Sequence, residues 1–182
     1  METKIIIAGS GGQGILFIGR MISCASMLEG KEVTWFPSYG AEMRGGTASC
    51  TVVVSDDMIG SPVVLNPDML IVFNNASLEK FQSKLRKKGT LLYDVSLIKN
   101  PVLRNDIEVE AVPATQIAGS IGNTRSANMV MLGALMAKTS FLQKSTIAKI
   151  FENNSGSAKN YNGKANINAV LEGIKYIEDK KS

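Results

Sequence analysis

Short apolar stretches alternate with longer helical stretches, and this pattern limits most strongly what the chain can fold into. The short stretches are rich in β-branched residues and are bounded by turn-forming residues, which is typical of strands. We expect strands at residues 4–8, 31–36, 47–56, 68–74, 89–95 and 107–114. We expect helices at residues 15–30, 77–89, 124–140, 144–154 and 166–181. The alternation predicts an α/β fold: a Rossmann-like, mostly parallel sheet flanked by helices.

The length of the chain, 182 residues, suits a single domain. We find no internal repeat and no second core, and we therefore predict one domain over residues 1–182. Residues 153–166 are polar and glycine-rich, so they are expected to form a long surface loop before the last helix. In that helix, we expect Ile167, Leu171 and Ile174 to form the apolar stripe. Ser145 is expected to cap the helix before the loop.

The residues that the chain lacks exclude several kinds of site. It contains no histidine, which excludes a Ser-His-Asp triad and histidine metal ligands. Its two cysteines, Cys24 and Cys50, are too few for a four-cysteine iron–sulfur cluster. We expect no catalytic residue and no metal site in this chain, and buried, reduced cysteines. Any redox centre must lie on another chain.

Charge and hydropathy argue against nucleic-acid and membrane partners. The net charge is +4, and a basic run at residues 84–88 is expected at the solvated end of the second helix, which would run from Ser77 to Gly89. Aromatic residues do not interleave with these charges, so nucleic-acid binding is not expected. No apolar run reaches the roughly 20 residues that span a bilayer. The opening residues do not read as a secretory signal, and we expect a cytoplasmic protein.

A glycine-rich turn between the first strand and the first helix is the first candidate site. Gly9, Gly11 and Gly14 have the spacing G-x-G-x-x-G, and Gly12 and Gln13 complete the turn. Such a turn lets backbone N–H groups approach an anion. No acidic residue ends the second strand to hold a ribose, and the turn has no P-loop lysine, so NAD binding is disfavoured. A tight turn that binds nothing stays open beside anion binding.

The stretch "PSYGAEMRGG" at residues 37–46 is the second candidate site. Its residues of interest are Tyr39, Gly40, Glu42, Arg44, Gly45 and Gly46. Arg44 offers a planar fork of donors for a carboxylate or phosphate. Glu42 would hold that fork in place or pair with a basic residue on a neighbouring subunit. A local pair on an exposed turn, worth roughly 0–1 kcal/mol, is the alternative. The neighbouring Trp35 and Phe36 fit a surface that a partner buries, although Trp35 also suits a plain core position.

The helix predicted at residues 124–140 is apolar on nearly every face, so it must be buried on several sides. The residues at its start are polar. Asn123 and Arg125 lie where a helix N-terminus meets an anion. Simple capping by Thr124 or Ser126 is the alternative.

Four stretches occur in an order that resembles a known family. They are "GSGGQGILFIGRMI", "VTWFPSYGAEMRGGTASCTVVVSD", "NPDMLIVFN" and "NMVMLGAL". Together they resemble the gamma subunit of the 2-oxoacid:ferredoxin oxidoreductases over most of residues 4–137. "FPSYGAEMRGG" is most similar to the 2-oxoglutarate branch, with the branched-chain and pyruvate branches close to it.

The resemblance implies a subunit of a larger enzyme. In that family thiamine diphosphate, Mg²⁺ and iron–sulfur clusters are held by the assembled enzyme, coenzyme A takes the acyl group, and ferredoxin takes the electrons. This chain would bind none of these cofactors alone and would be inactive alone. Its partners would be alpha and beta subunits, with or without a ferredoxin-like delta subunit, and its reaction would be the conversion of 2-oxoglutarate to succinyl-CoA. The resemblance implies that residues 39–46 face a subunit or the active site. A phosphate of coenzyme A is one anion that the helix N-terminus at Asn123 and Arg125 would meet.

Two other functions stay open from the residues alone. One is a free-standing nucleotide-binding enzyme such as an NAD-dependent dehydrogenase. The other is a non-enzymatic binding module on the same scaffold. Fold does not separate them, because function resides in sites.

Overall fold

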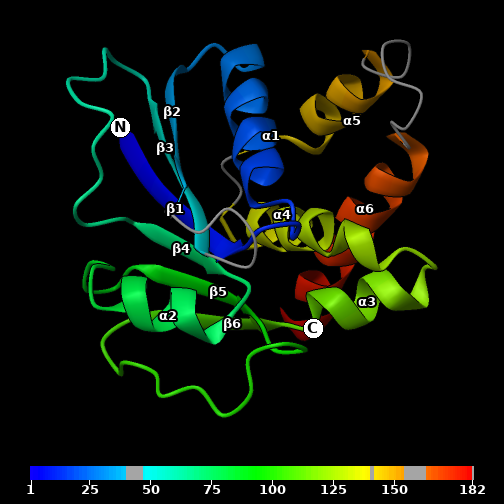
Figure 1. Ribbon diagram of the computed structural model, residues 1–182. Coiled ribbons are helices and arrows are strands. Elements are labelled where there is room, and N and C mark those ends of the chain that lie inside the picture. Colours follow the sequence, from blue (N-terminus) through cyan, green and yellow to red (C-terminus); the bar gives the residue numbers. More distant parts are fainter. Residues whose placement is uncertain (40–46, 140–141, 154–162, 182) are drawn as a thin grey trace.

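A six-stranded mixed sheet with helices on both faces forms the protein (Figure 1). The computed structural model describes residues 1–39, 47–139, 142–153 and 163–181. The strands are β1 (Glu2–Ser10), β2 (Glu32–Tyr39), β3 (Thr47–Ser55), β4 (Met69–Val72), β5 (Thr90–Asp94) and β6 (Glu108–Val112). The helices are α1 (Ile15–Leu28), α2 (Asn75–Gln82), α3 (Ala114–Ser120), α4 (Ala127–Thr139), α5 (Lys144–Asn153) and α6 (Gly163–Lys181), with a 3₁₀ turn η1 (Thr124–Ser126) before α4.

The sheet has the order β2-β3-β1-β4-β5-β6. The pairs β1–β4, β4–β5 and β5–β6 are parallel, and β3 is antiparallel to both β1 and β2. All the strands except β3 therefore point the same way, and the predicted fold class is confirmed. Only residues 40–46 join β2 to β3, and a connection this short suits an antiparallel pair.

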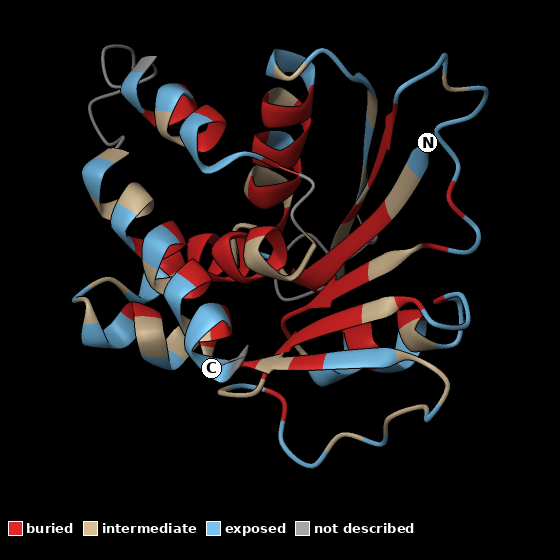
Figure 2. Cartoon of the chain, turned by 180° about the vertical axis from the view of Figure 1, so that it is seen from behind, coloured by how far each residue is buried: buried red, intermediate tan, exposed pale blue. Residues whose placement is uncertain are grey.

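One face of the sheet, called here the helical face, packs against α1, α3, α4, α5 and α6. Helix α4 is buried from Asn128 to Met136, as Figure 2 shows by its continuous red colour. Its closest neighbour is α6. A Cβ added to Gly133 would lie 2.0 Å from the carbonyl oxygen of Val170, and one added to Gly173 would lie 2.0 Å from that of Val130. The two glycines therefore allow the helix backbones to cross in contact, and the expected burial of this helix is confirmed.

The opposite face, called here the α2 face, packs against α2 and two loops. Its core includes Ile6, Leu70 and Leu91 from the sheet, and Leu78 and Phe81 from α2. α2 begins after Asn74, whose side chain accepts a hydrogen bond of 2.8 Å from the Ser77 amide. That bond satisfies one of the free N–H groups of the first turn. The predicted start of this helix at Ser77 is therefore wrong, because Asn74 is the capping residue.

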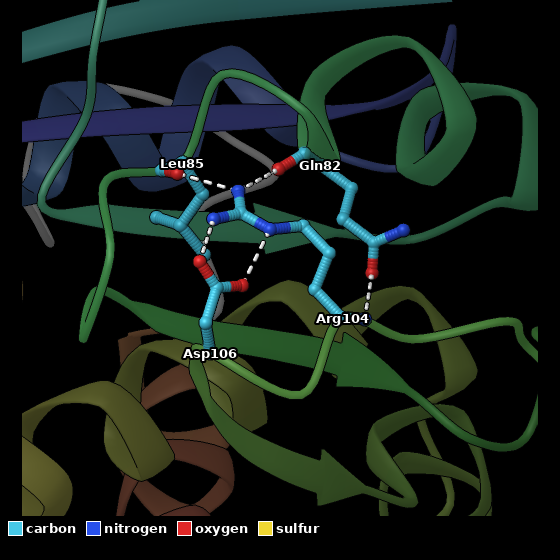
Figure 3. Close-up of polar contacts among 4 residues, drawn as sticks. All are labelled: Gln82, Leu85, Arg104 and Asp106. Carbon is cyan, nitrogen blue, oxygen red and sulfur yellow. Dashed lines mark hydrogen bonds and ion pairs between the residues drawn. The ribbon is translucent and has the colours of Figure 1, made fainter.

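Arg104 fixes the other end of α2 (Figure 3). Its Nη1 donates to the backbone oxygens of Gln82, at 2.9 Å, and Leu85, at 2.6 Å. Its Nε and Nη2 donate to the two carboxylate oxygens of Asp106 at 2.8 and 2.7 Å. This bidentate pair holds the guanidinium where it satisfies carbonyl groups at the helix end. It also raises the pKa of Arg104 and lowers the pKa of Asp106.

Several predicted boundaries differ from the structure. α2 ends at Gln82, so the basic run at residues 84–88 lies in turns and not on the predicted helix. Arg86 in that run pairs with Asp68 at 2.7 Å. Helix α3 was not predicted, because it has seven small and mixed residues without a clear apolar period.

Near the C-terminal end, the predicted helix cap and the predicted loop also differ from the structure. α5 begins at Lys144, so Ser145 lies within its first turn and does not cap it. α6 begins at Gly163, inside the loop predicted at 153–166; residues 154–162 of that loop are outside the described residues. The buried face of α6 includes Ile174 and Ile177, whereas Leu171 is 50% exposed and does not belong to the stripe.

Candidate functional site

The carboxyl ends of β1, β4 and β5 border a pocket of about 250 Å³. β1 leads into α1 on the helical face, whereas β4 leads into α2 on the other face. Neighbouring parallel strands whose connections leave on opposite faces form the crevice where α/β proteins bind ligands. The lining residues are Gly12, Gln13, Phe73, Leu97, Thr115, Thr124, Arg125 and Ala127. The pocket thus joins two candidate segments that lie far apart in the sequence.

The glycine turn has a packing role at some positions and faces the pocket at others. Gly14 has φ 73°, and a Cβ there would lie 2.2 Å from Nδ2 of Asn128. That Nδ2 donates to the Gly14 carbonyl at 3.3 Å, so the turn is fastened to α4. Gly12 also has positive φ, but a Cβ there would meet open space. A Cβ at Gly9 would lie 2.6 Å from Oε1 of Gln13, so Gly9 and Gly14 are needed for packing, whereas Gly12 lines the pocket.

Gln13 braces the turn from within. Its Oε1 accepts a hydrogen bond of 2.6 Å from the Ser10 amide, and its Nε2 lies 3.4 Å from the Phe73 carbonyl at the end of β4. Asn74 donates from Nδ2 to Oγ of Ser10 at 2.7 Å. The same Asn74 side chain caps α2, so it connects the glycine turn after β1 to the helix that follows β4. The sequence interpretation missed Asn74, although its place directly after an apolar strand was the available signal.

The η1 turn presents Arg125 to the pocket. Asn123 precedes the turn and donates from Nδ2 to Oγ of Ser126 at 2.7 Å. The side chain of Asn123 is thus bonded within the turn, and the Ser126 hydroxyl that accepts this bond belongs to the residue directly before α4. Arg125 is exposed, and no carboxylate among the described residues forms an ion pair with it. Its donors are therefore available to an anion.

Asp94 positions the wall of the pocket without lining it. This fully buried residue ends β5 and accepts hydrogen bonds from the amide of Thr115, at 3.1 Å, and its hydroxyl, at 2.5 Å. The amide of Ser96 donates to its other oxygen at 2.9 Å. Because the described lining contains an arginine and no carboxylate, the pocket favours a negatively charged ligand. Phe73, Leu97 and Thr115 of this wall were not predicted.

Neither cysteine lines the pocket. Cys50 is buried beneath α1, and burial raises the pKa of its thiol to about 12. A thiol of that pKa is protonated and unreactive near neutral pH. Cys24 is half-buried on α1. Within the described residues, no three acidic or cysteine side chains gather as a metal site, and no helix is long and apolar enough to cross a bilayer.

The second candidate stretch lies mostly outside the described residues. Gly40, Glu42, Arg44, Gly45 and Gly46 fall in the range 40–46, for which no structure is described. Tyr39 is the last residue of β2, and its Cα is paired with that of Ala48. A role of this stretch at a subunit boundary remains a prediction.

Comparison with protein families matches residues 4–176 to the family described as pyruvate ferredoxin/flavodoxin oxidoreductase. The ketoisovalerate oxidoreductase subunit VorA of Methanothermobacter marburgensis is 43% identical over 136 residues, which are 75% of this chain and 28% of VorA. The chain thus spans little more than a quarter of that relative. The 2-oxoglutarate synthase subunit KorC of Methanocaldococcus jannaschii is 34% identical over 152 residues, with 82% of this chain and 81% of KorC covered.

The chain is also similar to solved structures of 2-oxoacid:ferredoxin oxidoreductases. The 2-oxoglutarate:ferredoxin oxidoreductase of Magnetococcus marinus, solved with 2-oxoglutarate, coenzyme A and succinyl-CoA bound, matches with a TM-score of 0.89 and 26% identity. That match covers 98% of this chain and 31% of the other. The gamma subunit of a keto/oxoacid ferredoxin oxidoreductase from Geobacter sulfurreducens matches with a TM-score of 0.81 and 26% identity, over 97% of this chain and 99% of that one.

Proposed function

The chain belongs to the pyruvate ferredoxin/flavodoxin oxidoreductase family, and we propose that it is the gamma subunit of a multi-subunit 2-oxoacid:ferredoxin oxidoreductase. The observation that carries this proposal is the end-to-end similarity to the Geobacter gamma subunit, over 97% of one chain and 99% of the other. Alpha and beta subunits, with or without a ferredoxin-like delta subunit, then hold thiamine diphosphate, Mg²⁺ and the iron–sulfur clusters. Ferredoxin receives the electrons, and the assembly is cytoplasmic.

The pocket at the carboxyl edge is the part of this chain that meets coenzyme A in the proposal. Coenzyme A supplies the thiol that accepts the acyl group. Arg125 and the backbone at Gly12 would bind one of its phosphates, since the described lining has an arginine and no acid. A pocket of about 250 Å³ suits a phosphate-bearing part and not the whole molecule. The chain would thereby hold and orient coenzyme A, while the thiol reacts on a partner subunit.

For the substrate we propose 2-oxoglutarate. The stretch "FPSYGAEMRGG" and the KorC similarity, which extends over 81% of that relative, support it. A branched-chain 2-oxoacid is the second candidate, because identity to VorA is higher, 43% against 34%. The discriminating assay compares the rates of the assembled enzyme with 2-oxoglutarate and with ketoisovalerate.

The sheet order speaks against the NAD-dependent alternative. In a dinucleotide-binding fold the second strand pairs directly with the first and ends in the acid that holds the ribose. Here β3 lies between β1 and β2, and β2 runs to Tyr39 without a carboxylate at its described end. A tight complex with NAD, measured by calorimetry on the isolated chain, would revive that alternative.

Reconstitution tests the proposed function. The chain is purified alone and also after co-expression with the proposed thiamine-binding and cluster-binding partner subunits. Both preparations receive 2-oxoacid, coenzyme A, thiamine diphosphate, Mg²⁺ and a viologen dye. We expect dye reduction only from the assembly. Turnover by the isolated chain, or full turnover by the partner subunits without it, would contradict the proposed role.

Arg125→Ala tests the coenzyme A contact. We expect normal folding and a raised KM for coenzyme A with little change for the 2-oxoacid, because an exposed arginine contributes little to stability. The matched control is Arg20→Ala, an exposed arginine on α1 outside the pocket lining. Equal kinetics of the two variants would remove Arg125 from the site.

A further inference from the structure

Only one half of the α2 face of the sheet is covered by a helix. The row of paired residues Ile6, Thr51 and Phe36 crosses β1, β3 and β2. Ile6 is buried beneath α2, Thr51 is half-buried, and Phe36 is 58% exposed. Ser38 and Ser49 form the next paired row on the same strands. The β2–β3 half of this face therefore presents an aromatic ring and hydroxyl groups that no described helix covers.

An open groove of about 280 Å³ lies along this uncovered half. Its apolar part includes Phe36, Phe81 and Val63, the last of which is 65% exposed. Lys80 and Lys84 line its other side, with their Nζ atoms 5.2 and 5.5 Å from the centre of the Phe81 ring. The described lining includes no carboxylate, and neither lysine forms an ion pair with any described residue.

We propose that this groove docks a segment of a partner subunit that carries a carboxylate beside an apolar side chain; this inference rests on the proposed function. An apolar side chain from the partner would cover Phe36 and Val63, and the carboxylate would neutralise Lys80 and Lys84. Exposed apolar side chains beside charges are typical of surfaces that another protein buries. The Magnetococcus relative supports a neighbour, because the matching unit forms only 31% of its chain.

Charge selects this occupant over a second copy of the chain. A twofold pairing of the groove with itself would bring the lysines of both copies into one interface, where the described lining offers no carboxylate to pair with them. Like charges brought together away from water are unfavourable, so self-association through this face is opposed. An acidic segment has the complementary charge, and its attraction weakens with added salt.

Zero-length cross-linking of the assembled enzyme identifies the occupant directly. A carbodiimide joins a lysine amine to a carboxylate only when they are in contact. We expect peptides in which Lys80 or Lys84 is joined to an aspartate or glutamate of a partner subunit. Cross-links from these lysines only to this chain, or only between two copies of it, would overturn the proposal, as would their absence while other subunit cross-links form.

Charge reversal supplies the second test. Lys80→Glu combined with Lys84→Glu should weaken retention of the partner subunits on the tagged chain about tenfold, as expected for an interfacial charge contact. Phe36→Ser should also weaken it, without lowering the Tm of the isolated chain. The control is Lys149→Glu combined with Lys175→Glu, two exposed lysines on α5 and α6.

The wild-type chain separates this proposal from the proposed function. If wild type assembles and reduces dye, and both test variants assemble as the control does, only the docking surface is wrong. If wild type assembles with no oxidoreductase subunit, the proposed function itself fails.

Discussion

The two faces of the sheet are stabilised in different ways. On the helical face, α4 lies between the sheet and α6, and its backbone touches that of α6 at Gly133 and Gly173 (Figure 1). On the α2 face, a short helix covers half of the sheet and is fixed at its ends by Asn74 and Arg104. The first face depends on close packing between helices, whereas the α2 face has a smaller apolar core and its helix is fixed by a few polar contacts. Such a difference leaves the second face with surface that a partner can bind.

The largest effect is expected where the packing is tightest. Gly133→Ala places a Cβ 2.0 Å from a backbone oxygen of α6, so the two helices must move apart. We expect a loss of about 1–3 kcal/mol in the free energy of unfolding, the range typical of overpacking. Denaturant unfolding measures it, with Gly60→Ala as the control because a Cβ there meets open space. A stability equal to that of the control would show that α4 and α6 are not in contact.

A smaller loss is expected at the end of α2. Arg104→Ala removes both bonds to Asp106 and those to the carbonyls of Gln82 and Leu85. The Tm should fall by less than in Gly133→Ala but by more than in Arg86→Ala, which removes an exposed pair with Asp68. Arg104→Lys should recover only part of the loss, because an ammonium cannot form the bidentate pair. Equal Tm values for the alanine variants would reduce Arg104 to a surface contact.

Acid should weaken the polar contacts and leave the packing unchanged. The pKa of Asp56 is lowered from 3.8 to about 2 by hydrogen bonds from Lys31 and the N-terminal ammonium. The pKa of Asp106 is lowered by the hydrogen bonds from Arg104. A lowered folded-state pKa stabilises the protein above the unfolded-state pKa, and this contribution disappears as the pH falls through the folded-state value. We expect Tm to fall from about pH 4 to about pH 2.

Asp56→Asn and Asp106→Asn should each make that fall shallower and should lower Tm at neutral pH. Thermal melting between pH 2 and 7 measures both effects. An unchanged slope in both variants would show that other carboxylates control the acid response.

The smallest effect is expected on the uncovered half of the α2 face. Phe36→Ser changes a side chain that is 58% exposed, so the free energy of unfolding should change by no more than about 0.5 kcal/mol. A loss comparable to that of Gly133→Ala would mean that the ring is part of the core. The same variant then could not test docking.

The sequence predicted the fold class because periodicity and turn residues are local signals. All six strands lie within or near their predicted ranges, and the buried helix at α4 was evident from its composition. The misassigned features depend on single side-chain bonds or on weak periodicity. α2 begins directly after Asn74 because the side chain of Asn74 caps its first turn, and α3 has seven residues without an apolar stripe.

In the candidate site, too, the sequence predicted individual residues but not their arrangement in space. Gly12 and Arg125 were each singled out by residue type and position, but nothing in the sequence placed them in one pocket. Their meeting follows from the strand order, which brings the carboxyl ends of β1, β4 and β5 together. Phe73, Leu97 and Thr115 carry no motif of their own and become site residues only through this order.

The sequence by itself determined the six strands and every helix except α3, apart from their exact ends, and which chemistries the chain lacks. Those properties depend on residue type and on neighbours within a few positions. Only the tertiary structure decided that β3 lies between β1 and β2, that Gly133 and Gly173 meet, and that half of one face stays uncovered. These features are pairings between segments far apart in the chain, and many alternative pairings share the same local pattern. The choice among them belongs to the packing of the whole molecule.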